Sequence, residues 1–165
     1  MVRLGDLNID PGVADGASPE EIPIQSIIRY PFYAPPLRYH DIALVMLARP
    51  AELTEAIHPA CLWTSQTITH SEAVAIGWGV SDVIGNPGFS PHYRAETGQH
   101  SKVLQKVSLT LQDSAYCDRL LYINRNRNWA GFSPEQLCAG ELRPGKDTCQ
   151  GDSGAPLQVK WKNTY

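Results

Sequence analysis

The residues of this chain best suited to chemistry are an aspartate and a serine between two glycines, Gly151-Asp152-Ser153-Gly154. Glycine lets the backbone turn so that N–H groups and a serine hydroxyl converge on one point, which acyl transfer requires for its oxyanion. Such tetrapeptides are also common in tight β-turns that only reverse the chain. The segment therefore predicts either a nucleophile loop or a structural turn.

Composition narrows the class of protein. The chain has 165 residues, of which 42% are apolar and 19% charged, with a net charge of -3, which is typical of a folded globular protein. No run of Lys or Arg could follow a phosphate backbone, so we expect no nucleic-acid partner. The longest clean apolar run, residues 42–48, is far shorter than the roughly 20 residues of a membrane span, and we expect none. Residues 1–10 also lack the apolar core of a secretory signal.

Cysteine spacing favours disulfides over metal binding. The four cysteines, Cys61, Cys117, Cys138 and Cys149, are far apart and form no Cys-x-x-Cys pair or zinc-like spacing with histidine. Disulfides would place the protein in an oxidising compartment, which conflicts with the missing signal sequence.

The pattern of short apolar runs between turn residues predicts an all-β barrel or sandwich. The predicted strands are residues 22–28, 42–47, 73–78, 103–111 and 156–161. The single helix candidate is residues 114–122, with Asp113 or Ser114 as its N-cap. Residues 81–99 and 124–132 are predicted to be long surface loops.

The residues before Ser153 distinguish between a nucleophile loop and a plain turn. Asp147-x-Cys149-x followed by Gly-Asp-Ser-Gly resembles the nucleophile signature of the chymotrypsin/trypsin family. The resemblance implies that Ser153 is the nucleophile and that the N–H groups of Gly151 and Ser153 form the oxyanion hole. It implies that Asp147 lies buried at the base of the specificity pocket and selects Arg or Lys, with a solvated turn Asp as the alternative. Asp152 resembles the acid that pairs with the new amino terminus after zymogen cleavage.

Other motifs extend the resemblance over nearly the whole chain. Asp41-Ile42-Ala43-Leu44 is similar to the family segment that carries the triad acid, which gives Asp41 that role, although an Asp before a strand is more often a cap. Gly77-Trp78-Gly79 resembles the strand that opens the second barrel. Residues 137–140 resemble the strand before the specificity loop, and residues 30–36, rich in proline, are most similar to arthropod clip-domain proteases. Ala155 departs from the family, which most often has glycine there.

The resemblance also implies the fold and the cysteine partners. The fold would be the all-β, two-barrel trypsin-like fold, incomplete at both ends: residues 1–65 form the remainder of the first barrel and residues 66–165 an incomplete second barrel. Cys117 would pair with Cys138. Cys61 would tether the domain to a propeptide or light chain, and Cys149 would pair beyond residue 165, so both are unpaired in this chain.

The triad histidine is missing. In this family the triad runs His, Asp, Ser along the chain, so the histidine must precede Asp41, where only His40 occurs. Adjacent residues of an extended strand point to opposite faces, so we expect His40 to be a surface residue. The remaining histidines, His58, His70, His92 and His100, follow Asp41. We therefore expect this chain to be an inactive fragment of a secreted endopeptidase zymogen, with a non-catalytic homologue or an unstable fragment as alternatives.

The remaining expectations concern partners and metals. The resemblance implies protein substrates with Arg or Lys before the scissile bond and inhibitors of the serpin type. No catalytic metal is expected. A structural calcium ion near Asp6, Asn8, Glu20 and Glu21 is a weaker hypothesis, because acidic side chains at short spacing suit that ion. A solvated acidic loop is the alternative.

Overall fold

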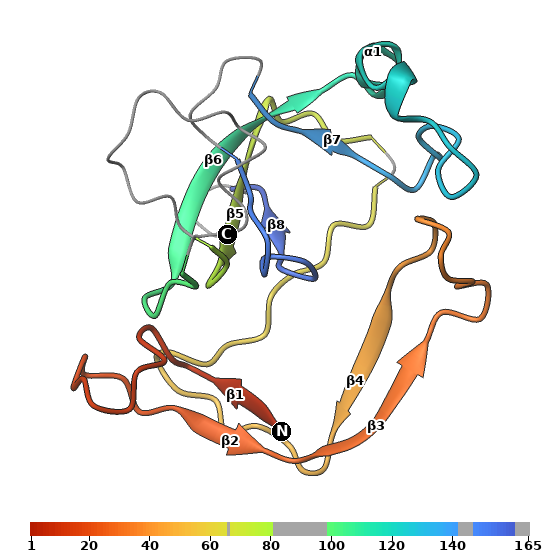
Figure 1. Ribbon diagram of the computed structural model, residues 1–165. Coiled ribbons are helices and arrows are strands. Elements are labelled where there is room, and N and C mark those ends of the chain that lie inside the picture. The colour runs from red at the N-terminus through yellow and green to blue at the C-terminus, as the bar shows by residue number, and fades with distance from the viewer. Residues whose placement is uncertain (66, 81–98, 142–146, 161–165) are drawn as a thin grey trace. The chain divides into compact units, whose positions relative to one another are not determined.

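The computed structural model describes residues 1–65, 67–80, 99–141 and 147–160, and most of its regular structure is β-strand (Figure 1). In chain order the elements are β1 (Val2–Leu4), β2 (Glu20–Ile22), β3 (Ile24–Arg29), β4 (Ala43–Leu47), β5 (Glu72–Gly77), β6 (Gln105–Gln112), α1 (Ser114–Leu120), the 3-10 helix η2 (Tyr122–Asn124), β7 (Cys138–Ala139) and β8 (Leu157–Gln158). The predicted all-β class is confirmed. The predicted loop at residues 81–99 falls almost wholly outside the described residues.

The chain forms two compact units that interleave along the sequence. The first comprises Met1–Asp6, Ala17–Ala60 and Leu111–Ala139, and the second comprises Leu7–Gly16, Cys61–Thr110 and Gly140–Tyr165. Each unit is described by itself. Both units contain segments from before and after residue 65, so they do not test the predicted division into two barrels at that residue. That division stays a prediction.

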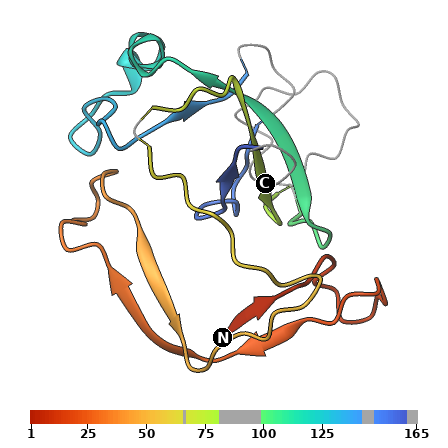
Figure 2. The same ribbon diagram turned by 180° about the vertical axis from the view of Figure 1, so that it is seen from behind.

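In the first unit, one proline divides a strand that the sequence predicts to be continuous. Pro23 has no N–H to donate to a neighbouring strand, so β2 ends before it and β3 begins after it. β2 pairs with β1, whereas β3 pairs with β4, both in antiparallel fashion. Figures 1 and 2 show β3 and β4 side by side from opposite views.

The second unit is built around β5. This strand pairs along its length with β6, from Glu72↔Thr110 to Gly77↔Gln105, and with β8 on its other edge. Ala73 and Ala75 of β5 are buried, as is Leu109 of β6. This alternation is that of a strand with one face toward a core. Of the strand predicted at residues 156–161, β8 covers two of the residues that the structure describes, and residue 161 lies outside them.

The helix α1 begins at the expected cap. The Asp113 carboxylate accepts a hydrogen bond from the Tyr116 N–H at 2.7 Å, which settles the choice between Asp113 and Ser114. The helix ends at Leu120 rather than at Tyr122, and the chain continues directly into η2. The implied disulfide between Cys117 and Cys138 is present and ties α1 to β7.

Removing this disulfide should destabilise the chain measurably. Cys117 and Cys138 are 21 residues apart in sequence, and cross-links of this span stabilise proteins by about 2–4 kcal/mol. We expect the Cys117→Ala/Cys138→Ala variant to lose about that much free energy of unfolding in urea titrations. The matched control is Cys61→Ala/Cys149→Ala, since both cysteines are exposed and unpaired. An unchanged midpoint for the first variant would contradict the prediction.

Burial is concentrated in few residues. Among the described residues, the buried apolar side chains are Ile22, Ile57, Cys117 and Trp129 in the first unit and Ala73, Ala75, Val80 and Leu109 in the second. The hairpin of β3 and β4 instead leaves large side chains exposed on both strands, including Ile27, Ile28, Leu44, Val45 and Met46. In the part of the chain that the structure describes, no helix has the length and apolarity to cross a bilayer.

Candidate active site

Ser153 lies on an exposed reverse turn between two glycines in left-handed backbone conformations. Gly151 has φ of 96° and Gly154 has φ of 86°, values that a side chain would disfavour. The turn is held by hydrogen bonds from Asp152 N–H to the Cys149 carbonyl at 3.1 Å and from Ala155 N–H to the Asp152 carbonyl at 2.9 Å. The glycines therefore set the backbone path that presents Ser153 at the surface.

The turn leaves hydrogen-bonding groups open for a reactant. Among the described residues, the N–H groups of Gly151 and Ser153 have no hydrogen-bond partner, and neither has the Ser153 hydroxyl. Unengaged backbone donors beside a hydroxyl are what stabilisation of an acyl-transfer oxyanion needs.

The Asp152 side chain anchors the turn by accepting two backbone hydrogen bonds. Its Oδ1 accepts a hydrogen bond from the Gly79 N–H at 2.7 Å, and its Oδ2 accepts one from the Cys149 N–H at 3.0 Å. Hydrogen bonds to an ionised acceptor are among the stronger ones in proteins. Asp152 thus fixes the turn to the strand end at residues 77–79, which lies more than 70 residues earlier in the chain.

Gly77 and Gly79 are required by the position of this carboxylate. A Cβ at Gly77 would lie 2.1 Å from Asp152 Oδ1, and a Cβ at Gly79 would lie 2.4 Å from both Oδ1 and Cγ. No Cβ approaches other atoms so closely in real proteins, so any side chain here would displace Asp152. The sequence marked Gly77-Trp78-Gly79 only as a barrel strand, and nothing local in it signals this contact.

His100 is a second neighbour of the turn that the sequence did not assign to it. A Cβ at Gly151 would lie 2.5 Å from His100 Cε1, so the imidazole packs directly against the glycine. His100 is held by a β-bridge to Val80, whose N–H donates to the Gln150 carbonyl at 2.8 Å. The fold thus brings together two segments about 50 residues apart in sequence. No motif or residue spacing in the sequence predicts that His100 and Gly151 lie close together.

The predicted triad acid lies in the first unit, whereas Ser153 lies in the second. Asp41 is exposed, and β4 begins two residues after it. The extended conformation expected at His40 was wrong: His40 has φ of 56°, and the Ile42 N–H donates back to its carbonyl at 2.9 Å. Pairing of β3 with β4 ends at Arg29↔Ala43, so no neighbouring strand keeps His40 extended. His40 is exposed, and its ring stacks on Tyr30.

The predicted specificity acid is on the surface. Asp147 is exposed and its Oδ1 accepts a hydrogen bond from the Thr148 N–H at 2.8 Å. The resemblance implies a buried carboxylate, whereas the described part of the chain leaves this one exposed. Cys61 and Cys149 are both exposed and form no disulfide.

The side chains of the calcium hypothesis have protein partners. Asp6 and Glu21 form ion pairs with Arg3, at 2.6 Å and 3.7 Å. Glu20 pairs with Arg49, and the hydrogen bond from Arg49 holds the pKa of Glu20 below its ordinary value. Asn8 Oδ1 accepts a hydrogen bond from the Asp10 N–H at 3.1 Å. Among the described residues no group of acidic, histidine or cysteine side chains is arranged to hold a metal, and calcium binding stays an untested prediction.

The chain is similar to known serine proteases over nearly its whole length. The Trypsin family model matches residues 2–163. Serine protease snk of Drosophila melanogaster is 34% identical over 96% of this chain and 33% of its own length. Phenoloxidase-activating factor 3 of Holotrichia diomphalia is 33% identical over 95% of this chain and 43% of its own length.

A solved structure agrees on the fold. Neuropsin, a serine protease expressed in the limbic system of mouse brain, matches with a TM-score of 0.73 and 24% identity, over 94% of this chain and 60% of that one. The chain spans between a third and a half of the length of the two insect relatives named above. The chain belongs to the trypsin family of serine proteases, with a partial trypsin-like two-barrel fold.

Proposed function

We propose that this chain is the nucleophile-bearing part of a longer, secreted trypsin-like endopeptidase that cleaves proteins after Arg or Lys. The observation that carries the proposal is the turn at Ser153, where left-handed glycines and the anchored Asp152 present an exposed hydroxyl beside unengaged N–H donors. The relatives' greater length supports a longer parent protein. The Cys117–Cys138 disulfide supports an oxidising, extracellular compartment.

In the proposed reaction the Ser153 hydroxyl attacks the carbonyl carbon of the scissile peptide bond. A histidine supplied by parent sequence outside this chain takes the hydroxyl proton and passes it to the leaving amine, while Asp41 orients that histidine. The N–H groups of Gly151 and Ser153 stabilise the oxyanion. Water then hydrolyses the acyl-enzyme and regenerates Ser153.

Specificity and control are assigned to two further carboxylates. Asp147 would pair with the Arg or Lys side chain before the scissile bond once parent sequence completes the pocket. Asp152 would receive the new amino terminus formed by zymogen cleavage, in addition to its present N–H donors. Inhibitors of the serpin type, which present such a residue as bait, are the proposed regulators.

We expect the 165-residue chain itself to be inactive, because a serine without a general base is an ordinary alcohol. A fluorophosphonate probe at neutral pH should leave Ser153 of this chain unlabelled, as read by intact-protein mass spectrometry. The activated parent should be labelled once per molecule, and its Ser153→Ala variant not at all.

Two outcomes would contradict this proposal. Stoichiometric labelling of the 165-residue chain would refute its inactivity. If the parent has no catalytic histidine in the sequence upstream of this chain and stays unlabelled, the alternative holds, namely a non-catalytic homologue that binds or regulates an active protease.

A further inference from the structure

A run of consecutive apolar side chains is exposed where α1 meets η2. Leu120, Leu121, Tyr122 and Ile123 are 53%, 36%, 69% and 87% exposed. We call these four residues the 120–123 patch. Leu120 and Ile123 are three residues apart, a spacing that places side chains on one side of a helical turn, and exposed apolar groups gathered in this way mark a candidate binding surface.

The patch rests on a rigid base within the first unit. The Asn124 N–H donates to the Leu121 carbonyl at 2.8 Å, and the Leu121 N–H donates to the Cys117 carbonyl at 2.8 Å. Cys117 is itself buried and disulfide-bonded. Because the backbone is held at several points, a partner would not have to order it, which lowers the entropy cost of binding.

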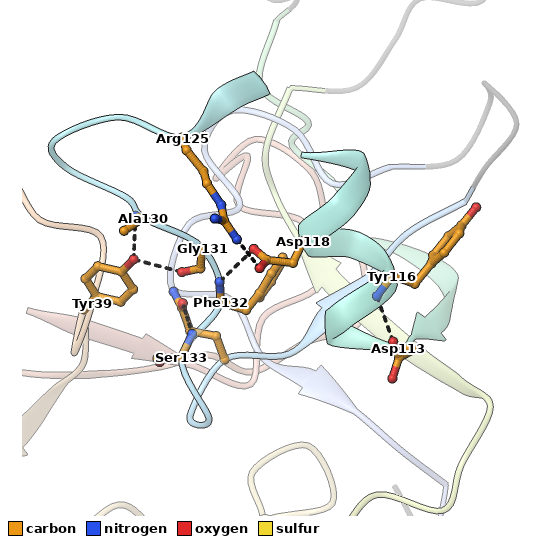
Figure 3. A network of polar contacts seen from close by, with 10 residues as sticks. Tyr39, Asp113, Tyr116, Asp118, Arg125, Ala130, Gly131, Phe132 and Ser133 are labelled. Carbon is orange, nitrogen blue, oxygen red and sulfur yellow. Dashed lines mark hydrogen bonds and ion pairs between the residues drawn. The ribbon is translucent and has the colours of Figure 1, made fainter. Parts of the chain in front are cut away.

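A polar network holds the chain that follows the patch (Figure 3). The Asp118 carboxylate pairs with Arg125 and accepts a hydrogen bond from the Phe132 N–H at 3.3 Å. The Tyr39 hydroxyl accepts from the Ala130 N–H at 2.7 Å and donates to the Gly131 carbonyl at 2.8 Å. The Asp118 carboxylate is therefore already paired within the chain and leaves no unpaired negative charge beside the patch.

Two arginines beside the patch, Arg119 and Arg127, have no ion-pair partner among the described residues. Between Asp118 and Glu135 the charged residues are Arg119, Arg125 and Arg127, of which Arg125 pairs with Asp118. The Arg125 guanidinium lies 5.4 Å from the centre of the Tyr122 ring, and that of Arg119 lies 5.7 Å from the Tyr116 ring.

We infer that the 120–123 patch is a docking surface for a partner protein segment that places apolar side chains beside carboxylates. The apolar groups would be covered by the partner's apolar side chains, and Arg119 and Arg127 would pair with its carboxylates. The inference does not depend on the proposed catalytic function, because the patch and Ser153 lie in different units.

The test is selection of peptides on the 165-residue chain. A phage-displayed library of random 12-residue peptides should yield binders in which Asp or Glu stands next to Leu, Phe, Tyr or Trp. Binding of a labelled synthetic copy, measured by fluorescence anisotropy, should weaken about tenfold in Tyr122→Ser/Ile123→Ser and several-fold in Arg127→Glu. Lys in place of the peptide's acidic residues should abolish binding.

The matched control is Leu53→Ser/Leu62→Ser, which removes two similarly exposed apolar side chains elsewhere. It should bind the peptide as tightly as the unmodified 165-residue chain does. Arg127→Glu keeps the test valid if the double patch variant fails to fold. The inference is overturned if no peptides are enriched, if the enriched peptides are neutral or basic, or if the patch variants bind normally. It is also overturned if hydrogen exchange in the full-length protein shows residues 120–123 covered by its own chain.

Discussion

Gly79→Ala should lower the rate at which the activated full-length protein reacts with a fluorophosphonate by about a hundredfold or more. The new methyl would stand 2.4 Å from Asp152 Oδ1 and Cγ and 2.6 Å from Oδ2, so the carboxylate must leave its site. Its departure breaks the hydrogen bonds from Gly79 and Cys149 that hold the turn. Loss of one oxyanion donor alone costs roughly 10²–10³ in rate.

Gly77→Ala should act in the same direction, since its methyl would meet the same carboxylate oxygen at 2.1 Å. Gly140→Ala is the matched control, because a Cβ there would have no atom of the described residues within 4 Å, and its rate should be unchanged. Faster exchange of the Gly79 and Cys149 amide protons in the variants would trace the loss to Asp152. A Gly79→Ala protein that reacts as fast as the unmodified protein would show that the turn does not depend on this contact.

Asp147→Ser should lower kcat/KM of the activated full-length protein for Arg and Lys substrates by roughly 10²–10⁴, because a substrate cation would enter the pocket without its partner. Breaking a buried ion pair by removing one member costs about 3–5 kcal/mol, and each 1.36 kcal/mol is tenfold in rate. Competing peptides that differ only in the residue before the scissile bond would measure the change. Asp147→Glu should restore part of it.

Glu55→Ser controls for the loss of one negative charge, since Glu55 is exposed and has no described hydrogen-bond or ion-pair partner. Fluorophosphonate labelling of Ser153 should persist in Asp147→Ser, because that side chain does not take part in the acylation of a small probe. If cleavage after Arg is unchanged while labelling persists, the specificity assignment fails and the role of Ser153 stands.

Local patterns predicted several elements well. The β-branched runs predicted the positions of β4, β5 and β6 to within a few residues. In β5 and β6 the pattern reflects a face that packs, since Ala73, Ala75 and Leu109 are buried. The N-cap at Asp113 follows from short-range hydrogen bonding, which sequence spacing reports directly. Pro23 shows where local reasoning was incomplete: its missing N–H divides a run that composition alone makes continuous.

The fold decided what spacing could not. His40 leaves the extended conformation because strand pairing stops at Ala43, which depends on the partner strand β3 and not on His40 itself. Asp147 is exposed although its motif implies burial, since burial requires other segments to pack over it.

By itself the sequence identified the family and predicted Ser153 as the nucleophile: the glycines permit the turn, and the motif around Ser153 carries the resemblance to serine proteases. Only the tertiary structure decided how that turn is held. Asp152 reaches the N–H of Gly79, and His100 packs against Gly151, across separations of 73 and 51 residues. These contacts depend on segments far apart in sequence that approach so closely that only glycine fits. The residue pattern within either segment does not report such an approach.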